Sequence, residues 1–253
     1  KEFAQLFGFD NYADFVLRRR MAQDARRANR FLDELRGTLD DAERRDISQL
    51  REAKAVHLGQ PNAKLERWDV SYYSERVRRE RYSVDQNLFR AYFPPEASLK
   101  FVMGIAEQLF GIRYIAVQGR FWHPDVKAYA VTDAASGAPL AGLMVDLYPR
   151  DGKYNHAAVW SLRGSASRAP VRLPQAALVV NVDRKGLSLD ELETLLHEFG
   201  HALHSNLSAT RYSSMAGTST LRDFVEAPSQ MLEEWVYDPK VLATFAKVCP
   251  DCK

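Results

Sequence analysis

The chain has 253 residues and 46% of them are hydrophobic, so it can bury a large core, as one large domain or two smaller ones. Its 35 basic and 33 acidic residues nearly balance, and the resulting net charge of +2 argues against a nucleic-acid partner. No apolar run approaches the roughly 18 residues of a transmembrane helix, so we expect no membrane insertion.

The first 110 residues are predicted to be helical. Asp10 can cap a first helix that we expect to end at Gly37, and a second helix continues to about residue 58. A third helix is expected over about 65–89 and a fourth over about 97–110. Residues 18–20 are three consecutive arginines, but acidic residues interleave nearby and no aromatic platform accompanies them. We expect a solvated helix face there rather than a nucleic-acid contact.

Residues 111–253 are predicted to form a small sheet followed by helices. Alternating or continuous apolar segments predict strands within 112–118, 126–133, 140–149, 156–160 and 176–182. Helix resumes after Ser188, which forms a capping box with Glu191. The expected fold is therefore mainly α with a small β-sheet (α+β), divided into a helical region, 1–110, and a sheet with helices, 111–253.

Both ends of the sequence look internal to a longer protein. It opens on Lys1-Glu2-Phe3 without a signal-like apolar stretch, and it closes with the pair Cys249 and Cys252. A zinc knuckle would need a second pair of ligands nearby, and a redox pair would follow a strand, whereas a helical stretch over 239–248 precedes this pair. We expect two free thiols, a reducing compartment and a cytoplasmic location.

The helix after Ser188 contains the segment LLHEFGHALH. His197 and His201 lie one turn apart on one face, beside an apolar stripe, and Glu198 is offset by about 100°. Two imidazoles in this arrangement can bind one metal ion while the glutamate reaches the metal-bound water. The alternative interpretation is a pair of hydrogen-bonded core histidines.

A catalytic zinc site needs a third protein ligand. The metzincin spacing is absent, because Leu207 stands where its third histidine would be. Glu226 lies at or near the start of a second predicted helix, where Pro228 fits the first turn and the helix dipole favours a carboxylate. We predict Glu226 as the third ligand, and we rank Glu233 and Glu234 as surface residues or residues that support the ligands.

Three segments, LYPRDGKYNHAA, LETLLHEFGHALH and RDFVEAPSQMLEEW, closely resemble the thimet oligopeptidase family of zinc metallopeptidases. The likeness covers most of the chain beyond the first helices. It is specific, because H-E-F-G-H followed at the same interval by F-V-E-x-P-S-Q is the zinc signature of that family. The resemblance implies that His197, His201 and Glu226 bind one Zn²⁺ per chain and that Glu198 is the general base.

The resemblance also implies part of a two-lobed helical shell around a channel that admits short peptides. The family's later segment, rich in Gly, His and Tyr, would begin past Lys253. The implied function is zinc-dependent hydrolysis of internal or near-terminal bonds in short peptides. The alternative is a zinc-binding, catalytically incomplete fragment of such an enzyme. A third interpretation is another gluzincin, such as an aminopeptidase, although those usually place the third ligand nearer. No oligomeric state is predicted.

Three residues near the site have open roles. Glu193 could accept a hydrogen bond from His197 and fix its tautomer, or it could be an exposed helix charge. A glycine inside a helix, such as Gly200, lowers stability by about 1 kcal/mol relative to alanine. The close approach of another helix or of substrate would explain why glycine occurs here, but the position could also have no special requirement for it. His156 could line the cleft or have only a structural role.

A free edge of the sheet could pair with an extended peptide.

Overall fold

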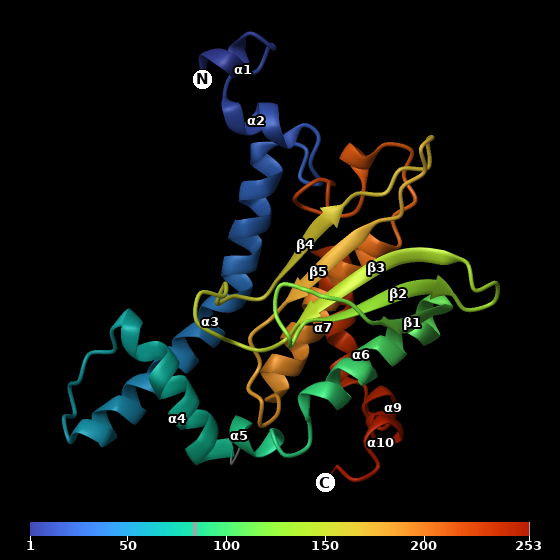
Figure 1. The fold of residues 1–253 in the computed structure, drawn as a ribbon. Helices are drawn as coiled ribbons and strands as arrows, with labels where there is room; N and C mark the ends of the chain where they lie inside the picture. The colour runs from blue at the N-terminus through green and yellow to red at the C-terminus, as the bar shows by residue number, and fades with distance from the viewer. Residues whose placement is uncertain (83–84, 253) are drawn as a thin grey trace. The chain divides into compact units, whose positions relative to one another are not determined.

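The computed structural model describes residues 1–82 and 85–252 (Figure 1). The chain divides into two compact units, residues 1–85 and 86–253. The first unit is helical, and the second combines helices with one five-stranded sheet. The predicted α+β fold is confirmed.

The first unit contains four helices and a short 3-10 helix among its described residues: α1 (Glu2–Gln5), α2 (Tyr12–Leu17), α3 (Ala25–Leu58), η1 (Arg67–Asp69) and α4 (Val70–Tyr82). The prediction that Asp10 caps the first long helix was wrong. Asn11 caps α2 by accepting a hydrogen bond from a backbone N–H three residues on, and Asp24 caps α3 in the same way. The arginine triplet follows α2 in a turn, so it does not lie on a helix face as expected.

Helix α3 continues through Gly37, where the sequence predicted an end. A glycine in a helix interior lowers stability by about 1 kcal/mol but does not by itself stop the helix, and the flanking residues are mostly strong helix formers. The helix ends at Gly59, whose φ of 62° is the left-handed C-cap conformation that glycine favours. The single helix expected over 65–89 is divided among η1, α4 and α5 (Gln86–Phe89), and residues 83 and 84 lie outside the described residues.

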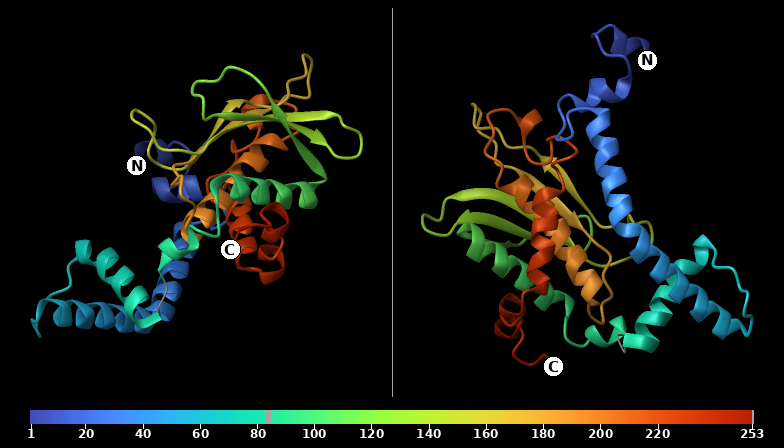
Figure 2. Two further views of the ribbon diagram at one scale, coloured as in Figure 1. Left: turned by 60° about the horizontal axis from the view of Figure 1, so that its bottom comes forward. Right: turned by 180° about the vertical axis from the view of Figure 1, so that it is seen from behind.

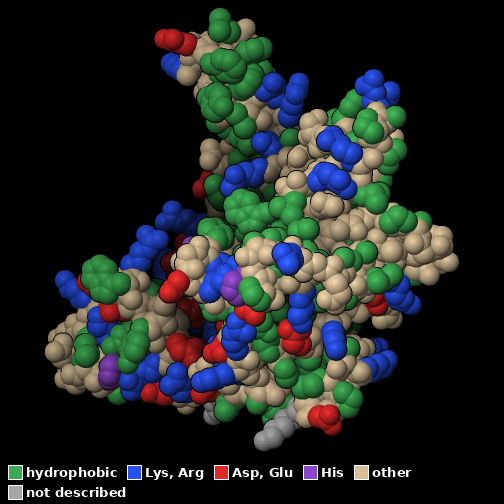
Figure 3. Space-filling view, viewed as in Figure 1, with side chains coloured by type: hydrophobic (Ala, Val, Ile, Leu, Met, Phe, Trp, Pro, Cys, Tyr) green, Lys and Arg blue, Asp and Glu red, His purple; other side chains and the backbone are tan. Residues whose placement is uncertain are grey.

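Hydrophobic side chains gather around α1 and α2, at the upper end of the first unit in Figure 3. The rings of Phe3 and Phe7 lie 5.2 Å apart, and both side chains are exposed. The guanidinium of Arg18 lies 3.9 Å from the centre of the Phe15 ring, a cation–π contact. Further along this unit, Leu50, Tyr73 and Val77 are buried where α3 and α4 pack together.

The second unit begins with α5. Along the chain, the five strands of its sheet then follow one long helix and precede another: α6 (Pro95–Phe110), β1 (Ile112–Val117), β2 (Lys127–Asp133), β3 (Pro139–Asp146), β4 (Ala158–Arg163), β5 (Gln175–Val179) and α7 (Leu189–Asn206). The five predicted strands and the helix after Ser188 are thus confirmed. The strand order is β1-β2-β3-β5-β4, with β3 and β5 parallel and the other pairs antiparallel.

Helices α6 and α7 pack on the same face of the sheet, which forms the layer above them in the left view of Figure 2. Leu143 and Val145 of β3, and Leu147 just after it, are each at most 3% exposed, as the predicted apolar face requires. These side chains join the buried faces of α6 and α7 in one hydrophobic core. Burial of this kind stabilises the fold by about 25 cal/mol for each Å² of apolar surface removed from water. The core therefore fixes α7 against the sheet.

After α7 the chain forms five short helical segments: η2 (Ser213–Met215), α8 (Ala227–Glu233), η3 (Glu234–Tyr237), α9 (Pro239–Leu242) and α10 (Phe245–Val248). The helical stretch predicted over 239–248 is confirmed and consists of two short helices, α9 and α10. The expectation of two free thiols was wrong, because Cys249 and Cys252 form a disulfide. The turn between them brings their Cα atoms to 5.4 Å, within the span that a disulfide bridges.

Within the described parts of the chain, no helix has the length and hydrophobicity needed to cross a bilayer.

Candidate metal centre

Helix α7 has an apolar face and a histidine face. The predicted capping box is present, because Ser188 and Glu191 each accept a hydrogen bond from the other's backbone N–H. The predicted apolar stripe is buried: Leu192, Leu195, Leu196, Phe199 and Leu203. His197 and His201 lie outside that stripe, with ring centres 4.9 Å apart. The two imidazoles can therefore reach one common point.

Glu226 meets both imidazoles from the following helix. It occupies the N-cap of α8, as predicted, with Pro228 in the first turn. Its Oε2 atom lies 3.0 Å from Nε2 of His201 and 3.4 Å from Nε2 of His197. One ligand atom from each of the three residues lies within 4.8 Å of the others. The structure thus brings together the three residues that the sequence proposed as ligands.

These donors suit a zinc ion. Two imidazole nitrogens and one carboxylate oxygen make up a three-ligand set of the kind that catalytic zinc sites use, with a fourth position open. Ligand atoms about 2.0–2.1 Å from a tetrahedral zinc ion lie about 3.3 Å from one another. The separations of 3.0 and 3.4 Å are close to that value. Burial lowers the pKa of His201, although Glu226 opposes the shift, and this favours the neutral imidazole that binds metals.

Glu198 follows the first histidine directly and is only 8% exposed. Burial raises the pKa of its carboxyl group; the nearby His197 opposes this shift and the negative charge of Glu226 adds to it. A carboxylate with a raised pKa is a better proton acceptor near neutral pH than an ordinary one. Glu198 therefore has the chemistry expected of a general base beside the ligand group.

Glu233, at the end of α8, contacts the other side of the first histidine. Its Oε1 atom is in close contact with Nδ1 of His197. A carboxylate in this position holds the proton on Nδ1 and leaves Nε2 free to bind a metal. The sequence left open whether Glu193 had this role, but Glu193 instead accepts a hydrogen bond of 2.6 Å from the hydroxyl of Tyr237. Glu234 begins η3 and is not part of the ligand group.

Gly200 lies where α8 crosses α7. A Cβ atom added there would come within 2.5 Å of the Cα atom of Ser229 and within 2.8 Å of the carbonyl oxygen of Pro228. Of the explanations considered for this glycine, the close approach of a neighbouring helix is confirmed.

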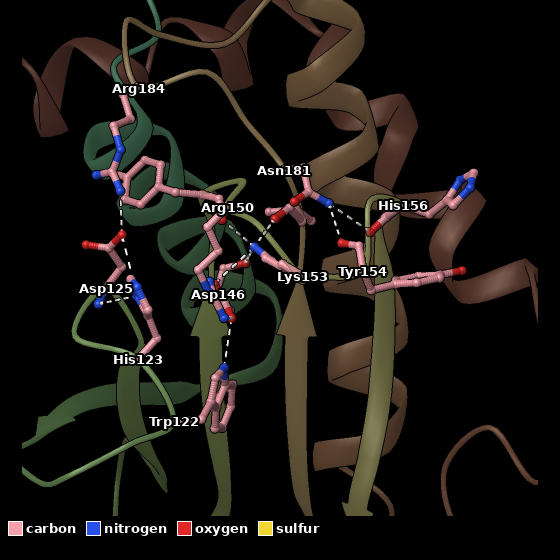
Figure 4. Close-up of polar contacts among 12 residues, drawn as sticks. Trp122, His123, Asp125, Asp146, Arg150, Lys153, Tyr154, His156, Asn181 and Arg184 are labelled. Atoms are coloured by element: carbon pink, nitrogen blue, oxygen red, sulfur yellow. Dashed lines mark hydrogen bonds and ion pairs between the residues drawn. The ribbon is translucent and has the colours of Figure 1, made fainter.

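A buried ion cluster, which the sequence analysis missed, holds the segment after β3. Asp146 is 1% exposed and accepts hydrogen bonds of 2.8 Å from both terminal guanidinium nitrogens of Arg150 and from the indole N–H of Trp122 (Figure 4). The Nζ atom of Lys153 lies 3.0 Å from an Asp146 carboxylate oxygen and also donates to three backbone carbonyls. The only signal in the sequence was an aspartate at the end of an apolar strand with two basic residues close behind.

The segment that leads into β4 is fixed by Asn181. Its side-chain amide donates hydrogen bonds of 2.9 Å and 3.2 Å to the backbone carbonyls of Tyr154 and His156 (Figure 4). The side chain of His156 is exposed, with its ring 5.5 Å from that of Tyr154, and it does not join the ligand group. Strand β4 that follows is one of the two edges of the sheet.

Comparisons with known proteins identify the family of the chain. The model for peptidase family M3 matches residues 1–248. The chain belongs to this family. Its resemblance to the thimet oligopeptidases is thereby confirmed, and the aminopeptidase interpretation is disfavoured.

Curated relatives of this M3 chain carry the names of several peptidases. It is 34% identical to the mitochondrial intermediate peptidase of Arabidopsis thaliana, over 97% of this chain and 36% of the relative. It is 33% identical to the thimet-like oligopeptidase of Dictyostelium discoideum, over 95% of this chain and 38% of the relative. It is 34% identical to the dipeptidyl carboxypeptidase of Salmonella typhimurium, over 96% of this chain and 36% of the relative. The M3 chain thus spans somewhat more than a third of the length of these relatives.

Proposed function

We propose that this chain carries the catalytic zinc centre of a metallopeptidase that cleaves internal or near-terminal bonds of short peptides. The observation that carries the proposal is the convergence of His197, His201 and Glu226, whose ligand atoms lie within 4.8 Å of one another. Membership of family M3 and the names of the relatives support peptide-bond hydrolysis as the reaction. The metal is proposed to be zinc because the donor set is the one that zinc prefers.

In this proposal His197, His201 and Glu226 hold one zinc ion. A bound zinc ion polarises a peptide carbonyl and lowers the pKa of its water to about 7. Glu198 accepts a proton from the attacking water and then gives it to the departing amine. The raised pKa of the Glu198 carboxyl suits both steps, because the group must take up a proton and release it within one turnover. Glu233 keeps the His197 ring in the orientation and tautomer that present Nε2.

The sheet offers a place for an extended peptide. Strands β1 and β4 are its two edges, and of these β4 packs against α7, the helix with the histidines. A peptide that adds to the outer edge of β4 would be held by backbone hydrogen bonds, largely independent of its side chains. This arrangement supports peptides in an extended conformation as substrates. A cytoplasmic location stays a prediction.

A second candidate is a zinc-binding chain that does not turn over peptides by itself. It is favoured by one observation, the coverage of only 36–38% of each of the three relatives. Groups that stabilise the oxyanion typically contribute about 100- to 1000-fold each to the rate of acyl transfer, so a chain without them would hydrolyse peptides slowly even with zinc bound. Zinc content together with turnover of an internally quenched peptide separates the two candidates.

Metal analysis of Glu226→Ala tests the ligand assignment. The variant should retain much less zinc than the unchanged chain after dialysis, because two imidazoles alone hold the ion weakly. Glu234→Ala is the matched control, because this exposed glutamate lies outside the ligand group. Equal zinc content in the Glu226→Ala variant and the unchanged chain would remove Glu226 from the ligand set and the proposal with it.

A further inference from the structure

We propose that Ser229 and Gly200 are positioning residues that hold the carboxylate of Glu226 at the two histidines. The inference rests on the proposed metal centre and assigns a task to two residues that bind no metal themselves. Both lie at one contact between α7 and α8, which is the only helix pair in the described second unit that brings ligands to the group.

Glu226 needs such support because its own surroundings restrain it little. Its side chain is 51% exposed, against 27% for His197 and 13% for His201. A glutamate side chain has three rotatable bonds, and fixing it in one rotamer has a substantial entropic cost. An exposed carboxylate therefore reaches a metal ion reliably only if another group limits where it can point.

Ser229 supplies that restraint from within the protein. It is fully buried, at 0% exposure. Its hydroxyl oxygen lies 2.8 Å from the backbone carbonyl oxygen of Glu226 and 3.0 Å from the same residue's Oε2 atom. That Oε2 atom is the one that faces both imidazoles. The hydroxyl has one proton and gives it to one of these two oxygens at a time; when Oε2 accepts it, a second lone pair of Oε2 stays directed at the metal position.

Gly200 allows Ser229 to occupy this place. The three atoms nearest to an added Cβ are all backbone atoms of Pro228 and Ser229, at 2.5 to 3.0 Å. Backbone atoms cannot rotate away as a side chain can, so any larger residue would push the first turn of α8 outward. Because Gly200 directly precedes His201, that displacement would move Glu226 away from the histidine it approaches most closely.

Zinc affinity of Ser229→Ala in the 253-residue chain tests the first half of the inference. Affinity is measured by competition with a coloured chelator, and the unfolding midpoint is measured beside it. Residues that support metal ligands typically contribute about 10- to 100-fold to affinity, and we expect a loss in that range. Ser98→Ala is the matched control, because Ser98 is equally buried at 0% exposure but lies on α6 and is not part of the ligand group. Its affinity should stay within about twofold of the unchanged chain.

The visible spectrum of the Co²⁺-loaded chain separates positioning from general stability. If Ser229 holds Glu226 on the metal, the Co²⁺ spectrum of Ser229→Ala should shift toward that of Glu226→Ala. The spectrum of Ser98→Ala should not shift, whatever its stability.

Gly200→Ala tests the second half, with Gly104→Ala as control because a Cβ at that helical glycine would meet nothing within 4 Å. We expect a loss of affinity of at least about tenfold for Gly200→Ala alone. Should Gly200→Ala fail to fold, the Ser229 variant still decides.

An affinity and Co²⁺ spectrum of Ser229→Ala that match those of Ser98→Ala would overturn the inference while leaving the metal centre intact. If the unchanged chain binds no zinc, or if Glu226→Ala binds it as tightly, the metal centre itself fails and the inference falls with it.

Discussion

Nδ1 of His197 is in close contact with the carboxylate of Glu233, so the two ring nitrogens of this histidine face two different glutamates. The second histidine lacks such a partner: Nδ1 of His201 is buried and has no hydrogen-bond partner among the described residues. One imidazole is thus oriented by a hydrogen bond and the other by packing in its helix. The contact with Glu233 therefore favours a free Nε2, the nitrogen that faces the proposed metal position, most directly at His197.

Replacing Glu233 with alanine should weaken zinc binding about 10- to 100-fold, because the His197 ring then loses the group that fixes its tautomer and rotation. Chelator competition measures the change. The exposed neighbour Glu234 provides a matched control, and Glu234→Ala should leave the affinity unchanged. If both variants bind zinc equally tightly, the contact between Glu233 and His197 is incidental.

Glu198→Gln should keep the zinc and lose peptide hydrolysis. Glutamine preserves the shape of the side chain but cannot accept a proton, and general bases of this kind typically contribute about 100- to 10,000-fold to the rate. Zinc content and the turnover of a quenched peptide are measured on the same samples, in a preparation whose unchanged sequence shows activity. A variant that retains turnover within a few fold would reduce Glu198 to a structural carboxylate.

The local parts of the candidate site could be predicted from the sequence. Ser188 and Glu191 identify the start of α7 by their spacing alone, and a helical repeat then places His197 and His201 on one face. Such patterns depend on residues within a few turns of one another. The end predicted at Gly37 failed because a single glycine is a weak signal when the residues on both sides favour helix.

Contacts between distant elements could not be predicted in the same way. The choice of Glu233 over Glu193 as the partner of His197 depends on the angle and depth at which α8 crosses α7, and Gly200 sets that approach. The cluster around Asp146 depends on the parallel pairing of β3 with β5, which places Lys153 beside the backbone carbonyl of Val180, 27 residues along the chain. No periodicity within a single segment encodes either arrangement.

Zinc should stabilise the chain against heat, and chelation should remove the effect. A ligand that binds only the folded state adds about 2.7 kcal/mol at a free concentration 100 times its Kd. For a unit of this size that corresponds to a rise in the unfolding temperature of about 5–10 °C. Differential scanning fluorimetry with zinc, with EDTA and with magnesium measures it. The His201→Ala variant should show no rise, and a rise of equal size in that variant would place the bound zinc elsewhere.

Asp146→Asn should destabilise the second unit by about 3–5 kcal/mol at neutral pH, because it leaves the buried ammonium of Lys153 without its counter-charge.

Burial alone would raise the pKa of Asp146, but hydrogen bonds from Arg150, Trp122 and Lys153 outweigh it and lower the pKa below the ordinary value of 3.8. A depressed pKa stabilises the folded state above the unfolded pKa, and this stabilisation is lost as the pH falls. Urea unfolding should therefore show a gap between Asp146→Asn and the unchanged chain that is constant from pH 7 to 5 and narrows below about pH 4. Asp151→Asn, an exposed position in the same segment, is the control and should show no gap. A gap for Asp146→Asn that stays the same down to pH 3 would mean that the folded state does not lower the pKa of Asp146, and that the variant loses stability through its altered hydrogen bonds and not through the lost charge.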